Sequence, residues 1–139
     1  MSGFTYKKGA EARLNADVDI LVDSIKIVLL DSADYTPDYD VDEFLSDIPG
    51  AARVAISSSL TGKSTTAGVF DADDVVLAAV TGDQSELVAI FQDTGVEATS
   101  RLLWLFDSAG TPGLPVTPNG TAITVTWSNG PNKIVNTDA

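Results

Sequence analysis

The sequence predicts a mainly β protein, built as one antiparallel β-sandwich or barrel-like domain with a short N-terminal helix. Three observations favour this fold class. Short apolar stretches rich in β-branched residues recur along the chain, glycine-containing turn clusters separate them, and strands do not alternate with long helices. The 139 residues match the usual size of one domain. Within it we expect an N-terminal arm over residues 1–13 and a β-sandwich over residues 14–139.

The earliest elements follow from the spacing of their apolar residues. Residues 10–23 are the best helix candidate, because three apolar residues recur there at helical spacing: Leu14, Val18 and Leu21. Residues 24–31 are rich in β-branched residues, bounded by polar ones and typical of a strand. Residues 41–48 are expected to form a single helical turn, which the Pro-Gly pair after it ends.

The rest of the chain predicts seven short strands. They cover residues 51–59, 66–70, 73–80, 86–93, 100–107, 121–127 and 133–136. Residues 121–127 alternate cleanly, which is typical of a strand with one face in water. Residues 102–106 are apolar on both faces, so we expect a central strand or one whose outer face a partner covers. Residues 110–120 hold three of the six prolines and are interpreted as an ordered connector.

Composition excludes several function classes. The net charge is −12, and a chain this acidic repels phosphate backbones, so we expect no nucleic-acid partner. No apolar run approaches the length that crosses a bilayer, and Met1-Ser2-Gly3 does not open a signal peptide. We therefore expect a soluble protein without membrane contact, made in a cytoplasm. The absence of cysteine removes disulfides, thiolate nucleophiles and thiolate metal sites.

The chain also lacks the residues that most catalytic sites use. Without histidine there is no Ser/His relay, no imidazole base and no His-ligated zinc. A paired-carboxylate glycosidase stays formally open, but so few aromatic residues hardly suffice for both a core and a cleft. The stretch Gly62-Lys63-Ser64-Thr65 resembles the end of a phosphate-binding loop, yet Ser57 stands where that motif needs glycine. We interpret the stretch as a turn, and we expect no enzyme and no cofactor.

Clusters of aspartate raise the question of a metal site. Asp38, Asp40 and Asp42 resemble the opening of a calcium loop. Glu43 stands where an EF-hand needs glycine, so this loop is not an EF-hand. A weak adventitious cation site there, or at the acids of residues 71–74, stays open, although surface acids usually face water. We therefore assign no metal site.

Residues expected to contact a partner come from three features. Residues 1–13 hold three basic residues and one acid, so they carry +2 against −14 for the remainder, and such an arm can dock on an acidic surface. A frayed terminus is the alternative. Tyrosines in the acidic loop of residues 32–40 are hard to bury without a partner. Arginines that enter apolar strands either pair with nearby acids or anchor an interface. The interface candidates are Tyr6, Lys7, Lys8, Arg13, Tyr35, Tyr39, Arg53 and Arg101.

Several stretches carry a resemblance at the level of the residue string. They are residues 25–36, 44–49, 52–55, 81–86, 93–95, 98–102, 114–120 and 123–127, which span nearly the whole chain after about residue 6. Together they resemble a family of small virion structural proteins of tailed bacteriophages. The resemblance implies a component of the phage particle, and no catalytic residues come with it.

Physical properties help to choose among virion roles. A small, acidic, cysteine-free β-domain suits the outside of a capsid shell, so the leading hypothesis is a capsid decoration (cement) protein. By analogy with such proteins we expect a homo-oligomer, with a trimer favoured, bound to the major capsid protein on the virion surface after synthesis in the bacterial host cytoplasm. One alternative is a minor tail or fibre-associated virion protein. Another is a β-sandwich module that binds host-surface glycan through Tyr35, Tyr39 or Trp127.

Overall fold

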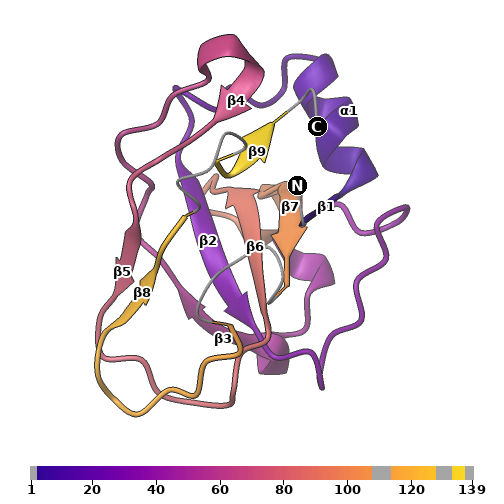
Figure 1. Ribbon diagram of the computed structural model, residues 1–139. Coiled ribbons are helices and arrows are strands. Elements are labelled where there is room, and N and C mark those ends of the chain that lie inside the picture. The colour runs from indigo at the N-terminus through magenta and orange to yellow at the C-terminus, as the bar shows by residue number, and fades with distance from the viewer. Residues whose placement is uncertain (1–2, 108–113, 128–132, 137–139) are drawn as a thin grey trace.

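Five antiparallel strands form the main sheet of the computed structural model, in the order β1-β7-β6-β2-β3 (Figure 1). They span Gly3–Thr5 (β1), Ile25–Leu30 (β2), Arg53–Ile56 (β3), Leu87–Gln92 (β6) and Leu102–Phe106 (β7). The structure describes residues 3–107, 114–127 and 133–136. Residues 1–2 of the expected arm, residues 110–113 of the expected connector and the turn clusters expected at residues 108–110 and 128–131 lie outside these ranges.

The three central strands, β2, β6 and β7, are buried on both faces of the sheet. All five residues of β7 are buried, as are all but Lys26 in β2 and all but Leu87 in β6. Strand β2 pairs with β6 over its full length, from Ile25 opposite Gln92 to Leu30 opposite Leu87. Because side chains alternate between the faces of a strand, these apolar runs create two separate cores, one on each side of the sheet.

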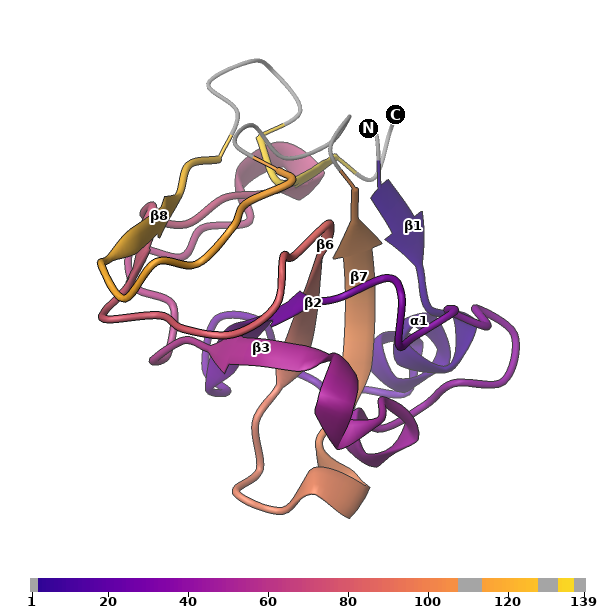
Figure 2. The same cartoon turned by 90° about the horizontal axis from the view of Figure 1, so that it is seen from below.

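Two small antiparallel sheets cover one face of the main sheet (Figure 2). Strands Val69–Phe70 (β4) and Val135–Asn136 (β9) form one, and Val75–Leu77 (β5) and Ile123–Val125 (β8) form the other. Their aromatic rings reach the main sheet, since the centroid of Phe70 lies 5.7 Å from that of Trp104. Trp127, just after β8, lies with its ring centroid 6.5 Å from that of Phe106. These contacts define the larger core.

Short 3-10 turns and the loop before them cover the opposite face. Leu45–Asp47 (η1) and Gly50–Ala52 (η2) bring Leu45, Ile48 and Ala52 onto the second core. Tyr6 and Tyr35 complete this layer. Two further 3-10 turns, Thr66–Gly68 (η3) and Glu97–Thr99 (η4), lie in connections between strands. Both faces of the main sheet are therefore shielded from water within a single chain.

Helix α1, Lys7–Leu14, starts before the expected helix of residues 10–23 and is only eight residues long. Its last turn closes when Ala16 takes a left-handed conformation, with φ of 61°, and the Asp17 amide donates to the Ala12 carbonyl. The spacing of Leu14, Val18 and Leu21 wrongly predicted a buried helix face. Leu14 is 88% exposed, and Val18 is the one buried residue of the three. The helix is held instead by close backbone contact with β7.

A β-bulge on β7 receives this helix. Ile90 pairs with Trp104 and Phe91 with Leu102, so Leu103 is an extra residue in the strand. The Leu103 carbonyl accepts a hydrogen bond from the Tyr6 amide, immediately before the helix. Gly9 then faces Leu102 so closely that an added Cβ would lie 2.1 Å from the Leu102 carbonyl oxygen. Only glycine allows the helix this position.

The predicted fold class, a mainly β antiparallel single domain with a short N-terminal helix, is confirmed. Each expected strand contains an observed one, although most are shorter, and Leu102–Phe106 is indeed central. One local expectation is wrong: residues 66–68 form a 3-10 turn instead of strand, because Ala67 takes a positive φ of 56°. The single helical turn expected within residues 41–48 is present and covers Leu45–Asp47. No helix within the described ranges is both long and apolar enough to cross a membrane.

Gly9→Ala is expected to lower the free energy of unfolding by about 1–3 kcal/mol, the usual cost of overpacking a close contact. The sign is informative, because alanine otherwise stabilises a helix interior relative to glycine. The measurement is the urea midpoint of unfolding. Gly50→Ala is the matched control, since nothing lies within 4 Å of an added Cβ there. Equal midpoints for the two variants would contradict the close contact of the helix with β7.

Candidate functional site

The eight interface candidates fall into four places in the structure. Four of them meet where the N-terminal segment crosses the acidic loop: Tyr6, Lys7, Tyr35 and Tyr39. Lys8 and Arg101 line one polar pocket. Arg13 and Arg53 each make separate contacts within the domain. The N-terminal segment and the loop tyrosines, which the sequence named separately as candidates for contact with a partner, thus contact each other within the chain.

Tyr6 and Tyr35 form a buried hydroxyl relay. The two hydroxyl oxygens lie 2.9 Å apart, and the Tyr35 hydroxyl donates to Asp42 Oδ2 at 2.6 Å. The same carboxylate oxygen accepts from the Asp38 amide at 3.0 Å. Burial raises the pKa of both phenols above the usual value, and the ionised form of either would also meet the Asp42 charge. The relay therefore stays protonated and ties residue 6 to the acidic loop.

Two interface candidates and the expected arm are corrected by this geometry. Tyr6 is fully buried and Tyr35 is 6% exposed, so neither side chain can contact a partner on the surface. Each ring packs into the second core, and the two hydroxyls satisfy each other's hydrogen-bonding needs together with Asp42. Residues 3–13 do not project as an arm, because β1 pairs with β7 and α1 packs on it.

The outer side of the same junction is a mixed aromatic and charged surface. Phe4, on β1, is 46% exposed and stacks on Tyr39 with ring centroids 5.0 Å apart and planes at 20°. Lys7 forms an exposed ion pair with Asp40, and its amide donates to the Tyr39 carbonyl. We call Phe4, Lys7, Tyr39 and Asp40 the N-terminal edge surface, because β1 is an outer strand of the main sheet. Phe4 was not among the interface candidates named from the sequence. No sequence pattern indicated that its ring would stack on Tyr39.

Lys8 and Arg101 lie in a polar pocket of about 190 Å³ beside helix α1. Acidic residues of the same pocket surround these two bases: Glu11, Asp17 and Glu43. Arg101 Nη1 lies 3.4 Å from Glu43 Oε1, and the guanidinium stands 5.4 Å from the centroid of the Phe44 ring. The interpretation of Arg101 as a residue that pairs with nearby acids fits these contacts.

Arg13 lies over the ring of Trp104, with its guanidinium carbon 4.5 Å from the ring centroid. Its Nε is buried and has no hydrogen-bond partner among the described residues, and burial lowers the pKa of the side chain. Beside it lies a small apolar pocket of about 120 Å³ that Ile20, Phe70 and Val135 line. Arg13 thus makes a cation–π contact at the edge of the larger core.

Arg53 holds the 3-10 turns of the second layer. Its Nη2 donates to the carbonyls of Leu45 at 3.0 Å and Ile48 at 2.7 Å, while Nε donates to the Ile48 carbonyl at 3.1 Å. Nη1 pairs with Glu97 at 2.5 Å. The Leu45 carbonyl also accepts from the Ile48 amide at 3.0 Å, so Arg53 adds a second donor at this end of η1. The side chain is engaged within the domain, as the pairing interpretation of the sequence expected.

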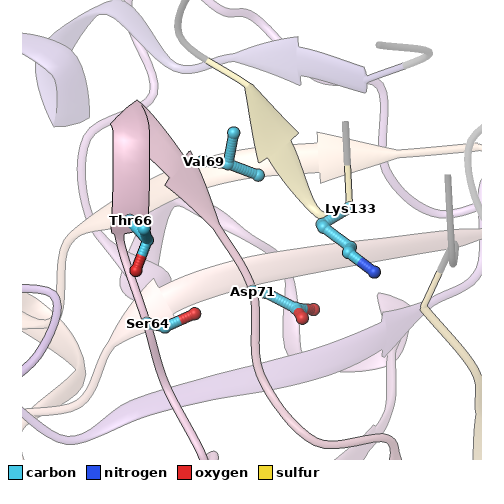
Figure 3. A pocket seen from close by; sticks show the side chains of 5 residues that line it. All are labelled: Ser64, Thr66, Val69, Asp71 and Lys133. Atoms are coloured by element: carbon cyan, nitrogen blue, oxygen red, sulfur yellow. The ribbon is translucent and has the colours of Figure 1, made fainter. Parts of the chain in front are cut away.

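The stretch that resembled a phosphate-binding loop contributes to a different pocket. Ser64, Thr66, Val69, Asp71 and Lys133 line a pocket of about 250 Å³, where the side chains of Ser64, Asp71 and Lys133 face a common space (Figure 3). Lys63 does not line it, because its Nζ donates to the Asp23 carbonyl at 2.6 Å. A carboxylate in the pocket opposes phosphate binding. Gly62, with φ of 63°, makes the expected bend.

The acidic clusters named from the sequence are used inside the chain. Asp38 Oδ1 accepts from the Asp40 amide at 3.1 Å, while Asp42 serves the relay. In the second group, Asp73 accepts from the Thr61 hydroxyl at 3.0 Å and Asp74 from the Trp127 amide at 2.9 Å. These carboxylates therefore order turns.

Another acidic group forms from parts of the chain far apart in sequence. Asp31, Asp34 and Asp83 each place a carboxylate oxygen within 4.8 Å of the others. We call them the Asp31 cluster. No sequence pattern could reveal this cluster, because Asp83 belongs to a separate turn that only the fold brings close.

Comparison with known proteins adds no family to these observations. Neither protein-family models nor curated proteins give a significant match to this chain.

Tyr35→Phe is expected to reduce the free energy of unfolding by about 1–3 kcal/mol, because it leaves the buried Tyr6 hydroxyl without its partner. Urea unfolding followed by tryptophan fluorescence measures the change. Tyr39→Phe is the matched control, since no hydrogen bond of the Tyr39 hydroxyl is found among the described residues and its loss should shift the midpoint little. A midpoint that responds equally to both substitutions would argue against the relay.

Alkaline pH is expected to destabilise the fold through the same two phenols. A tyrosine ionises near pH 10 in the unfolded chain, whereas the folded pKa values of Tyr6 and Tyr35 are higher. The unfolded state therefore releases these protons first, so stability is full below about pH 10 and falls as pH rises above it. Absorbance at the tyrosinate band should rise for Tyr6 and Tyr35 only together with unfolding. Their reversible ionisation in a folded protein would contradict the buried relay.

Proposed function

We propose that this chain is a non-catalytic structural protein of a tailed bacteriophage particle, a capsid decoration protein that binds the outer surface of the major capsid shell. The observation that carries the virion assignment is the string resemblance over residues 25–127, which covers most of the domain. A net charge of −12 and the absence of cysteine agree with a protein that is added in many copies to a shell in a reducing cytoplasm.

The N-terminal edge surface is the best-supported contact region for this role. It combines an exposed aromatic stack, Phe4 on Tyr39, with the charged pair Lys7 and Asp40. Aromatic residues with a polar rim are the composition typical of interface centres. Within the part of the chain that the structure describes, strand β1 also leaves one backbone edge unpaired in the main sheet, which gives directional hydrogen-bonding groups next to the stack.

The rival roles have weaker support. A glycan-binding module would need an exposed aromatic platform. Tyr35 and Trp127 are both buried inside the domain, which leaves Tyr39, in its stack with Phe4, as the one accessible residue of the three named for this role. Attachment to the tail or a fibre uses the same contact chemistry, so copy number and location separate it from decoration of the head. The homo-oligomer, with a trimer favoured, belongs to the decoration proposal and follows from analogy with decoration proteins.

The decisive experiment is a reconstruction of the particle whose genome encodes this chain, combined with quantification of the protein per particle. Decoration predicts hundreds of copies on the head, at repeated positions of the shell lattice, and early rupture of particles that lack the protein on heating. A handful of copies confined to purified tails would overturn decoration in favour of the tail alternative. Absence from purified particles would overturn the virion role altogether.

Binding to stripped particles tests the contact region. Phe4→Ala removes the outer ring of the stack and is expected to lower head occupancy at least about tenfold, the scale of a truncated aromatic anchor. Val96→Ala is the matched control, because Val96 is an exposed apolar residue on a different loop. Unfolding midpoints of both variants establish that the fold is intact. Unchanged occupancy with Phe4→Ala would remove the N-terminal edge surface from the proposal.

A further inference from the structure

A groove of about 270 Å³ separates strand β3 of the main sheet from strand β5 of a small sheet. The β3 side contributes Ala55, Ile56 and Ser58, and the β5 side contributes Val76, Ala78 and Val80. Ile56 is 45% exposed and Val76 is 60% exposed, so apolar surface is open to water on both walls. Exposed β-branched residues on facing strands are suited to contact the side chains of another extended segment.

The backbone of β3 offers free hydrogen-bonding groups along this groove. Strand β3 is one of the two outer strands of the main sheet, and among the described strands it pairs with β2 alone, with Ile56 opposite Val28 and Ala55 opposite Leu29. The Ser57 amide donates to the Ile27 carbonyl at 2.9 Å, which directs residue 57 toward β2. Because these directions alternate in an antiparallel pair, the amide and carbonyl of Ile56 point away from β2. An additional strand can therefore pair with β3.

The Asp31 cluster lies near the start of β3, whose later residues line the groove. The Asp31 amide donates to the Ala52 carbonyl at 2.9 Å, immediately before β3. The turn that carries Asp83 also lies there, since a Cβ added at Gly82 would be 3.8 Å from Val54 Cγ1. Asp31 is only 8% exposed, and no ion pair of the three carboxylates is found among the described residues. Three close carboxylates favour a cationic partner near the start of β3.

We propose that the groove between β3 and β5 binds an extended segment of a partner protein that carries apolar side chains followed by lysine or arginine. The segment pairs with the free edge of β3, its apolar side chains contact Ile56 and Val76, and its basic side chain reaches the Asp31 cluster. This is the β-augmentation mode of peptide recognition. A second copy of the chain is disfavoured as the occupant of this groove, because the Asp31 cluster favours a basic segment and the chain carries 20 acidic residues against 8 basic ones.

The proposal does not depend on the virion role. Strands β1 and β3 are opposite edges of the five-stranded sheet, so this groove and the N-terminal edge surface are different regions of the molecule. The order of the strands in Figure 2 shows the same separation, with β1 at one side and β3 at the other. A chain with both surfaces can contact two partners at once.

Short synthetic peptides test the groove directly. The probes are fluorescently labelled peptides of alternating valine and threonine whose termini are blocked. One pair carries two lysines, at the N-terminal end in one peptide and at the C-terminal end in the other, and a second pair carries two glutamates in the same positions. We expect the lysine peptides to bind, to weaken with added salt and to shift the backbone amide signals of residues 54–58 and 75–78. The glutamate peptides should bind at least about tenfold more weakly, as measured by fluorescence anisotropy.

Variants assign the binding to its two parts. Ile56→Lys and, as a second variant, Val76→Lys should each reduce the affinity of the lysine peptides at least about tenfold. The double variant Asp34→Asn with Asp83→Asn should do the same, whereas its matched control, Glu11→Gln with Asp17→Asn, removes equal charge elsewhere and should have little effect. Amide spectra report whether each variant is folded.

Four results would overturn the proposal. They are equal binding of lysine and glutamate peptides, equal losses from the control and cluster variants, amide shifts outside the groove, and no binding at all. Self-association of the chain that Ile56→Lys abolishes would also overturn it, because the occupant would then be a second copy.

Discussion

The three central strands of the main sheet are apolar on both faces, and this double burial determines what the rest of the chain must do. A sheet of this kind cannot present either face to water, so each face needs its own covering layer. The chain supplies one layer from two short β-ribbons and the other from 3-10 turns and a tyrosine pair. Helix α1 sits at the boundary, where the backbone of Gly9 lies against β7.

The strands could be predicted from sequence because their signal is local. The composition of residues 25–30 and 102–106 alone predicts buried strands. The alternation of apolar and polar residues over 123–127 predicts a strand with one face exposed to water. The helix could not be placed in the same way. Its register is set by the bulge at Leu103, almost a hundred residues away, and the apolar residues at helical spacing turned out to be largely exposed.

The candidate sites show the same division between local and distant information. Tyr35 and Tyr39 were recognisable from the sequence as unusual residues of an acidic loop. Which of them is buried depends on Tyr6, whose hydroxyl contacts that of Tyr35, whereas the ring of Tyr39 stacks on Phe4. Arg53 and Arg101 form ion pairs with Glu97 and Glu43, as charged residues that enter strands commonly do. The Asp31 cluster and the groove beside it arise only when separate turns are brought together by the sheet.

The pairing of β1 with β7 has a consequence for the order in which the molecule can be made. Gly3 lies opposite Phe106, so β1 finds its neighbour only after the whole stretch up to β7 has been synthesised. Until then β2, β3 and β6 can assemble, while the N-terminal residues and one side of the second core wait for Leu102 and Leu105. Closing so long a loop is slow. The residues of β1 are therefore synthesised before those of the other strands of the main sheet and are among the last of them to reach their native contacts.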